Sequence, residues 1–454
     1  MSLSIGLDFG TSNSSVAVFD GEQVTLVPLD GAARDPVVMR SLLYLTKHGE
    51  RFAGQAAFDR HQRDNVGRAV KLERTYVGDV TMTFSGVGTI TIEANALIDV
   101  NEPGRLFQSI KSLLPDRVFA KTSVYGVDLT AEDLVQLLAG EILQRAERVL
   151  GRPIERLTVG RPVHFSAKAA DDALARERLR TALERLGVPH LDFLEEPVAA
   201  GIGFAQEHAA ALGDGQPFLV FDFGGGTLDV TVLRGAGERA EVLATGGTPI
   251  GGDLLDKRIV EARLLRQFGE SATFGPRRLP VPRHILARLL DWQTLYLLNR
   301  PEPLALIEEI QRSCSQPREL ENLRTLVTRG YGAALFRTVE EAKQRLSEAG
   351  HAPIVLEREG LNVRDVLTRE GFEGMIRAQY EAALALVDAV VRDAGVAPEA
   401  VAAIVTTGGS SRIPLFQRGL RGRLPNARLA EQHAFTSVAA GLAIAGWQGR
   451  RAAA

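Results

Sequence analysis

Two glycine turns in distant parts of the chain carry residues suited to binding a phosphate. The first reads Asp8-Phe9-Gly10-Thr11-Ser12-Asn13, and the second reads Asp222-Phe223-Gly224-Gly225-Gly226-Thr227-Leu228-Asp229. Glycine lets backbone N–H groups approach an oxyanion closely, and a Thr or Ser hydroxyl adds another donor. An aspartate would repel a bare phosphate, so its presence indicates a cation between the two groups. Two such turns facing each other would clamp a magnesium-nucleotide from both sides.

Each turn lies between segments with the pattern of β-strands. Apolar runs at 3–7 and 218–221 precede the two turns, and alternating apolar residues follow both. This order predicts a strand, a tight turn and a second strand in each case. A single Asp-Gly turn is usually only a hairpin, but two copies of the same pattern favour the phosphate clamp.

Length and composition limit the classes of protein. The chain has 454 residues, more than one core usually supports, so two lobes or more are expected. The formal net charge of −3 gives no signal of binding to nucleic acid or to an acidic membrane. Cys314 is the only cysteine, which excludes an intrachain disulfide and a thiolate metal site. Without a leader pattern or an apolar stretch long enough to span a bilayer, we expect a cytoplasmic protein.

Turn-forming and linker-like residues along the chain predict how it divides into lobes. We expect lobe I at 1–212 with an insert at about 31–128, and lobe II at 217–447 with an all-helical insert at about 262–335. Residues 448–454 are expected to form a frayed tail.

Local patterns also predict individual helices. Residues 130–150 have helical spacing, with Thr130 and Asp133 forming a capping box and Gly151 ending the helix. Further helices are expected at 167–187 and 438–447.

Three more motifs, together with the two turns, identify the family that the chain resembles. They are Glu195-Glu196-Pro197-Val198-Ala199-Ala200-Gly201, Ile250-Gly251-Gly252-Asp253 and Thr407-Gly408-Gly409-Ser410-Ser411-Arg412-Ile413-Pro414. From about residue 3 to about 447, the chain resembles the nucleotide-binding domain of the DnaK-type heat-shock chaperones, within the actin/hexokinase superfamily. Among these it is most similar to the compact YegD-like proteins. The resemblance implies an α/β, actin-like ATPase fold, with two lobes that each hold a β-sheet flanked by helices around a central nucleotide cleft.

The resemblance implies ATP or ADP and Mg²⁺ as ligands and gives roles to matching residues. Metal binding would fall to Asp8, Asp222 and Asp229, and catalysis to Lys111, Glu196, Asp222 and Thr227. Lys71 is a second candidate for the catalytic lysine. Phosphate-binding residues would be Gly10, Thr11, Ser12, Asn13, Gly224, Gly225, Gly226 and Thr227, with Gly251, Gly252 and Asp253 contacting phosphate and ribose. Adenosine would contact Glu340, Lys343, Ser347, Gly408, Gly409, Ser410 and Arg412.

The chain departs from the family pattern at several positions. Gln344 replaces an arginine that would stack on adenine, and Phe435 replaces an acidic residue before the last helix. Pro162 matches the proline of the family's interdomain switch, but Ala170 stands where its arginine would be. No segment matches the peptide-binding β-sandwich, so binding of extended peptides in the usual manner is not expected.

These observations predict a Mg²⁺-dependent ATP hydrolase and chaperone, or a nucleotide-driven switch with little turnover, that lacks the peptide-binding domain. Protein clients or a co-chaperone are the partners that the resemblance implies. The alternatives are a small-molecule, sugar-type kinase of the same superfamily and an actin-like filament former. Phosphate release without an acceptor would favour hydrolysis over transfer by a kinase, and light scattering with and without ATP would test for filaments.

Overall fold

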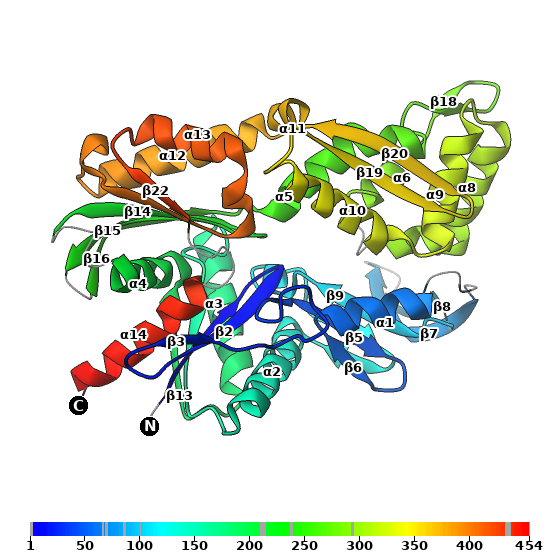
Figure 1. Cartoon of the computed structure of the whole chain (residues 1–454). Coiled ribbons are helices and arrows are strands. Elements are labelled where there is room, and N and C mark those ends of the chain that lie inside the picture. The colour runs from blue at the N-terminus through cyan, green and yellow to red at the C-terminus, as the bar shows by residue number, and fades with distance from the viewer. Residues whose placement is uncertain are drawn as a thin grey trace.

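Two β-sheets with helices on their faces form the framework of this α/β chain (Figure 1). The structure is a computed structural model. It describes residues 3–65, 68, 71–84, 88–99, 101–208, 215–236, 239–291, 295–431 and 437–453.

The first sheet has the order β13-β12-β1-β2-β3, with β4 also paired to β2. Its strands are β1 (Ser4–Phe9), β2 (Asn13–Phe19), β3 (Val24–Leu26), β4 (Met39–Arg40), β12 (Arg156–Arg161) and β13 (His190–Glu195). β1 and β2 are antiparallel and are joined by the first glycine turn, whereas β12 and β13 run parallel to β1. The predicted hairpin therefore forms at the centre of this sheet.

The second sheet repeats this arrangement in the order β16-β15-β14-β21-β22. Its strands are β14 (Pro217–Phe223), β15 (Leu228–Ala236), β16 (Arg239–Thr248), β21 (Ala403–Thr407) and β22 (Arg428–Glu431). β14 and β15 form the antiparallel hairpin around the second glycine turn, and β21 runs parallel to β14. Each turn thus occupies the same place in its own sheet.

Outer helices cover the two sheets. α2 (Ala131–Leu150) and α3 (Ala169–Glu184) pack with the first sheet in one apolar core. The capping box of α2 is confirmed, since Thr130 Oγ1 accepts from the N–H of Asp133 at 3.2 Å and Asp133 accepts from the N–H of Thr130 at 2.8 Å. α12 (Arg377–Asp393) and α13 (Pro414–Arg423) lie above the second sheet in Figure 1.

Two further helices lie between the sheets. α4 (Glu196–His208) packs on β14, β15 and β16, and α14 (Ser437–Ala453) packs on α4, β1, β2 and β12. Small residues allow this contact, because a Cβ on Gly441 would lie 1.7 Å from the carbonyl oxygen of Ala199. The chain therefore returns to the first sheet at its end, so α14 is a correction to the expected division in which 217–447 form lobe II alone. Helical periodicity indicates an apolar face but not which sheet that face covers.

The expected tail at 448–454 is also corrected. α14 continues to Ala453, and its last four residues are Arg and Ala, which are good helix formers.

Each sheet carries an additional subdomain on the right in Figure 1. In the first, β5 (Leu42–Thr46) pairs with β6 (Arg51–Ala53) and β9 (Gly104–Gln108), α1 (Gln55–Asn65) packs on them, and β7 (Leu72–Phe84) pairs with β8 (Gly88–Asp99). The second contains α5 (Gly252–Ile259), α6 (Arg283–Arg288), α8 (Pro301–Ser313), α9 (Pro317–Thr328), α10 (Gly332–Arg345) and the hairpin β19 (His351–Arg358)–β20 (Leu361–Thr368). We call the first sheet with its subdomain lobe I and the second sheet with its subdomain lobe II.

The segment 262–335 is not all-helical as expected. Its helices are interrupted by the strand pair β17 (Thr273–Phe274) and β18 (Leu279–Pro280). The turn between these strands holds Gly275 in the left-handed region and Pro276 after it, and neither favours a continuous helix.

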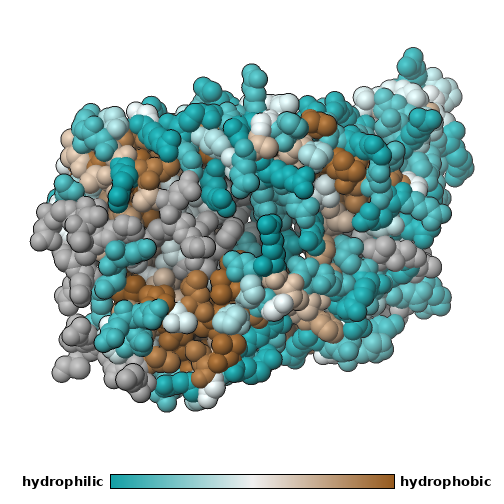
Figure 2. Space-filling view, in the orientation of Figure 1, coloured by the Kyte–Doolittle hydropathy of each residue, from teal (hydrophilic) through white to brown (hydrophobic). Residues whose placement is uncertain are grey.

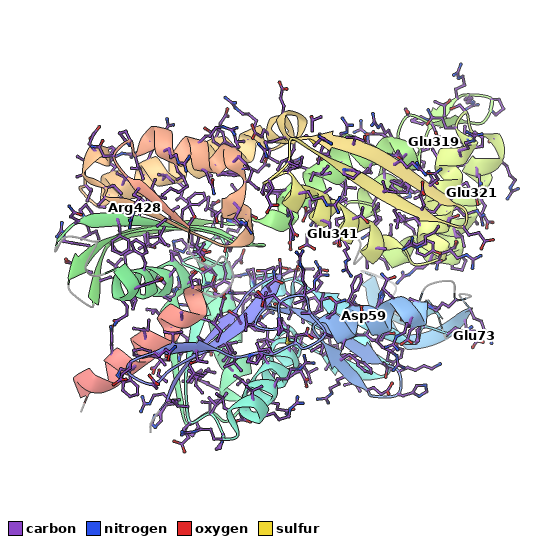
Figure 3. All side chains as sticks on the ribbon, viewed as in Figure 1. Asp59, Glu73, Glu319, Glu321, Glu341 and Arg428 are labelled. Atoms are coloured by element: carbon purple, nitrogen blue, oxygen red, sulfur yellow. The ribbon has the colours of Figure 1, made fainter. Side chains whose placement is uncertain are left out.

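The hydropathy of the surface is that expected for a folded chain whose apolar residues are mostly buried. Much of the face in Figure 2 is hydrophilic, with separate hydrophobic areas. Figure 3 places Asp59 of α1 in lobe I and Glu341 of α10 in lobe II. Nowhere in the described ranges is a helix both long enough and apolar enough to cross a membrane.

Candidate functional site

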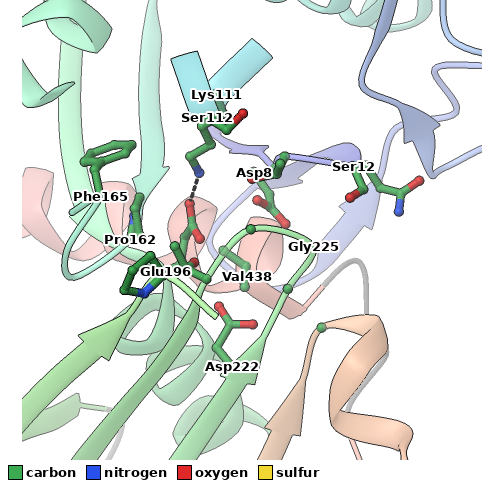
Figure 4. Close-up of a pocket in the computed structure, with 18 of the residues that line it drawn as sticks. Asp8, Ser12, Lys111, Ser112, Pro162, Phe165, Glu196, Asp222, Gly225 and Val438 are labelled. Carbon is green, nitrogen blue, oxygen red and sulfur yellow. Dashed lines mark hydrogen bonds and ion pairs between the residues drawn. The ribbon is translucent and has the colours of Figure 1, made fainter. Parts of the chain in front are cut away.

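Both glycine turns line one cavity of about 420 Å³ between the lobes (Figure 4). The carboxylates of Asp8 and Asp222 point toward one another from opposite lobes (Figure 4). The predicted residues in this lining are Asp8, Gly10, Thr11, Ser12, Asn13, Lys111, Glu196, Asp222, Gly224, Gly225, Gly226, Thr227, Gly408 and Gly409. The structure therefore brings together the phosphate-binding and catalytic sets inferred from distant segments.

The two turns touch each other, which explains their glycines. A Cβ on Gly225 would lie 2.0 Å from Ser12 Oγ, and a Cβ on Gly226 would lie 2.7 Å from Thr11 Oγ1. Both distances are shorter than any real contact. A side chain at either position would therefore require Ser12 or Thr11 of the first turn to shift.

Lys111 and Glu196 form a buried ion pair in this cavity (Figure 4). Lys111 lies on a 3₁₀ turn at Ile110–Leu113, and Glu196 is the first residue of α4, where Pro197 favours the start of a helix. Lys71, the other candidate, is exposed and pairs with Glu73 at 2.6 Å. It does not line the cavity.

The cavity brings several carboxyl groups close together. Burial, followed by the charge of Glu196, raises the pKa of Asp8 and of Asp222 well above the usual range, and Lys111 opposes this effect. Mg²⁺ is commonly held by one or two carboxylates together with substrate phosphates and water. The described residues contain no group of three His, Cys, Asp or Glu side chains that could hold a metal ion alone. Asp8 and Asp222, which face each other across the cavity, are a pair of carboxylates of the kind that can hold a cation together with a phosphate.

Asp229 lies outside the cavity lining and is occupied by protein donors. Its Oδ1 accepts from the N–H of Val163 at 3.0 Å, and its Oδ2 accepts from Thr227 Oγ1 at 3.0 Å. Burial, followed by the charge of Glu196, raises the pKa of Asp229 to about 8. This side chain therefore fixes Thr227 and the loop after β12.

That loop is also held by Arg176, which sequence reasoning missed. Arg176 Nη2 donates to the carbonyl oxygen of Val163 at 2.8 Å, and Nε donates to Asp172 Oδ2 at 2.9 Å. Asp172 Oδ1 in turn accepts from the N–H of Phe165 at 2.7 Å. An arginine on α3 thus anchors the loop, although Ala170 stands where the resemblance expects one. The sequence signal for this contact is an Arg four residues after an Asp, but that spacing is common on helices.

The residues expected around adenosine do not all line the same cavity. Gly251, Asp253 and Glu340 line a second cavity of about 390 Å³, which shares Thr11, Ser12, Gly225 and Gly226 with the first. Gly252, Lys343, Ser347, Ser410 and Arg412 line neither cavity.

Two of these residues instead bind protein groups. Lys343 Nζ donates to the carbonyl oxygen of Gly252 at 3.0 Å and to Asp256 at 2.8 Å. Ser410 Oγ donates to the carbonyl oxygen of Gly224 at 3.3 Å.

Ser347 lies just after the end of α10 at Arg345, and Arg412 lies after β21. Arg412 is exposed and pairs at 3.8 Å with Glu348, the neighbour of Ser347. Gln344 is also exposed, and Phe435 lies outside the described residues.

A contact that the sequence did not predict closes the second cavity. Arg40 of lobe I pairs with Glu340 of α10 at 3.0 Å. The guanidinium of Arg337, one turn earlier on α10, lies 4.9 Å from the centre of the Phe58 ring. One face of α10 therefore bridges to lobe I beside the phosphate turns.

Comparison with known proteins now decides the family. The model of the family described as "Hsp70 protein" matches residues 4–275 and 329–447, which is most of the chain. The chain belongs to the Hsp70 family. The two sheets with their flanking helices accordingly form the actin-like ATPase fold of Hsp70 proteins.

Individual Hsp70 relatives agree. The chain is 26% identical over 434 residues to chaperone protein dnaK3 of Synechococcus elongatus, covering 93% of this chain and 47% of that protein. It is 29% identical to the chaperone protein HscA homolog of Cupriavidus taiwanensis, covering 92% and 54%. The HscA homolog of Shewanella amazonensis is 28% identical, covering 97% and 58%. The chain thus spans about half the length of the curated relatives it matches.

The Hsp70 match leaves out residues 276–328. This segment contains α6, α8 and α9 of lobe II. The glycine turns and Lys111 all lie inside the matched ranges.

Proposed function

We propose that this Hsp70-family chain binds Mg-ATP between its two glycine turns and hydrolyses it to ADP and phosphate. The observation that carries the proposal is the single cavity lined by both turns, by Asp8 and Asp222, and by the Lys111–Glu196 pair. Phosphoryl transfer needs little covalent work from a protein, because positioning and charge stabilisation supply most of the catalysis. This cavity offers both.

Each side chain has a role in this proposal. Asp8 and Asp222 would hold Mg²⁺, which would neutralise charge on the phosphates. Glu196 and Thr227 orient the attacking water, and Asp229 fixes Thr227 through the hydrogen bond at 3.0 Å. Lys111 stabilises charge on the transferred phosphoryl group, and its place in the cavity favours it over Lys71.

We further propose that ATP turnover serves a chaperone activity on protein clients, with a co-chaperone as a partner. The three relatives compared above are all named as chaperone proteins, which supports this role. We also propose that the protein is cytoplasmic. Within the family, we propose that it belongs to the YegD-like members. The low net charge favours protein partners over nucleic acid or membranes.

The test is a thermal-shift titration with ATP, ADP and GTP, each with and without Mg²⁺. Saturation at about 100 times the dissociation constant adds roughly 2.7 kcal/mol to stability. We expect a shift with ATP and ADP that increases with Mg²⁺, and phosphate release from ATP without an added acceptor. No shift with any nucleotide would overturn the proposal.

A further inference from the structure

Asp253 forms hydrogen bonds with three segments whose relative positions matter for the proposed reaction. Its backbone N–H donates to the carbonyl oxygen of Gly225 at 2.9 Å, which ties it to the second glycine turn. Its Oδ1 accepts from Ser12 Oγ of the first turn at 3.3 Å. Its Oδ2 accepts from Ser109 Oγ at 2.8 Å, two residues before Lys111. One residue of lobe II thus holds both a phosphate turn and the lysine segment of lobe I.

Ser109 adopts a backbone conformation that a serine rarely takes. Its φ of 52° and ψ of 36° lie in the left-handed region, which is unfavourable for a residue other than glycine. Such strain persists where surrounding contacts fix the residue, and it is concentrated at functional sites. Ser109 is buried, and its carbonyl oxygen accepts from both the N–H and the hydroxyl of Ser112. The strained residue therefore begins the short turn that carries Lys111.

The position of Asp253 argues against direct contact with the reacting phosphate. It lines the second cavity and not the first, where Lys111 and Glu196 lie. Both of its oxygens already accept hydrogen bonds from hydroxyl groups. A carboxylate facing a phosphate without a cation between them would also be repelled.

We propose that Asp253 is a positioning residue, which places Lys111 in the cavity by holding the strained Ser109 hydroxyl from the opposite lobe. This inference rests on the proposed ATPase and gives Asp253 a role other than the ribose or phosphate contact expected from the resemblance. Lobe closure and the placement of Lys111 are then one event, because the same carboxylate makes both contacts.

Turnover provides the first test, with Asp253→Ala, Ser109→Ala and the double variant. Displacing a reacting group by about 1 Å can cost roughly 100-fold in rate. We expect each single variant to lower kcat by about 10- to 100-fold with little change in nucleotide Kd. The double variant should be no slower than the slower single variant, since both remove one interaction. Asp253→Asn, which keeps an acceptor oxygen, should lose less than Asp253→Ala.

Hydrogen exchange on the nucleotide-free protein provides a test that does not depend on turnover. The N–H of Ser112, bonded to Ser109 at 2.9 Å, reports on the lysine segment. We expect Asp253→Ala to speed its exchange by roughly tenfold, the effect of losing a hydrogen bond to a charged group. Asp116→Asn is the control, because Asp116 lines the same cavity but its side-chain Oδ1 accepts from the N–H groups of its neighbours Val118 and Phe119.

The outcomes separate the two proposals. If the native chain does not hydrolyse ATP but Asp253→Ala still loosens the lysine segment, the ATPase proposal fails and the coupling stands. Unchanged exchange overturns the coupling, as does a tenfold weaker nucleotide Kd with unchanged kcat, which would make Asp253 a nucleotide ligand.

Discussion

Lys111 of lobe I and Glu196, the first residue of α4, form an ion pair inside the cavity lined by both glycine turns. Both side chains are buried. A buried pair of this kind needs additional charges or hydrogen bonds to offset its loss of water. Burial and the charge of Glu196 raise the pKa of Asp8 and of Asp222 beside it. A cation between these carboxylates, as in the proposed Mg-ATP complex, would favour their ionised forms.

Lys111→Ala should lower ATP turnover while leaving nucleotide affinity nearly unchanged. Removing one preorganised donor typically costs roughly 10²- to 10³-fold in rate. Single-turnover hydrolysis and equilibrium nucleotide binding measure the two effects separately. Lys71→Ala is the matched control and should keep native turnover, because Lys71 is exposed and pairs with Glu73. The reverse result would transfer the role to Lys71.

Asp222→Asn should increase the Mg²⁺ concentration required for activity more than it weakens binding of ATP itself. Loss of a group that supports a metal typically costs roughly 10- to 100-fold in metal affinity. Magnesium titrations of hydrolysis, at saturating ATP, measure the shift. A titration that matches the native protein would count against a metal role for Asp222.

Glu340→Ala should speed release of ADP by a few-fold. The Arg40–Glu340 pair joins the lobes beside the phosphate turns, and a partly exposed pair is worth about 0.2–1 kcal/mol. Stopped-flow release of a fluorescent ADP analogue measures the rate. Glu381→Ala, which removes an exposed pair with Arg377 on α12, should leave release unchanged. Equal release from all three proteins would mean that the bridge does not limit opening.

His61 should make stability depend on pH. Burial lowers the pKa of His61 to about 4, against about 6.5 when unfolded. The unfolded chain therefore binds more protons between these values, so stability is complete above pH 6.5 and falls as the pH decreases toward 4. From pH 7 to pH 5 this group alone should cost about 2 kcal/mol.

His61→Phe tests this assignment, because it keeps the ring that packs edge-on against Tyr44 with centroids 5.6 Å apart. Urea unfolding at pH 7 and pH 5 should show a smaller loss of stability in the variant. His48→Gln, at an exposed position, is the control. An identical pH dependence in native and His61→Phe proteins would exclude His61 as the cause.

Local rules predicted the parts of the fold that depend on neighbours in sequence. The capping box of Thr130 and Asp133, the end of α2 at Gly151 and both hairpins required only turn, cap and strand patterns. The packing of α14 on the first sheet could not be predicted, because an apolar helical face does not indicate which sheet it will cover.

The site divides in the same way. Asp8, Asp222 and the glycines of the two turns could be selected from local turn patterns, and the structure places them in one cavity. Arg176 and the Arg40–Glu340 bridge act through contacts between distant segments, and nothing in their local sequence distinguishes them from surface charges. Ser109 likewise forms its hydrogen bond with Asp253, which lies far along the chain.

Calorimetric titration of Mg-ATP into the native chain, and into Thr11→Val and Gly226→Val variants, tests the central claim most directly. Thermal unfolding of each variant first establishes that it is folded. We predict one nucleotide per native chain and an affinity at least about tenfold weaker when either turn is altered, since a single lost charge-assisted hydrogen bond is worth about that much. Two nucleotides per chain, or native affinity with one turn altered, would contradict a shared site.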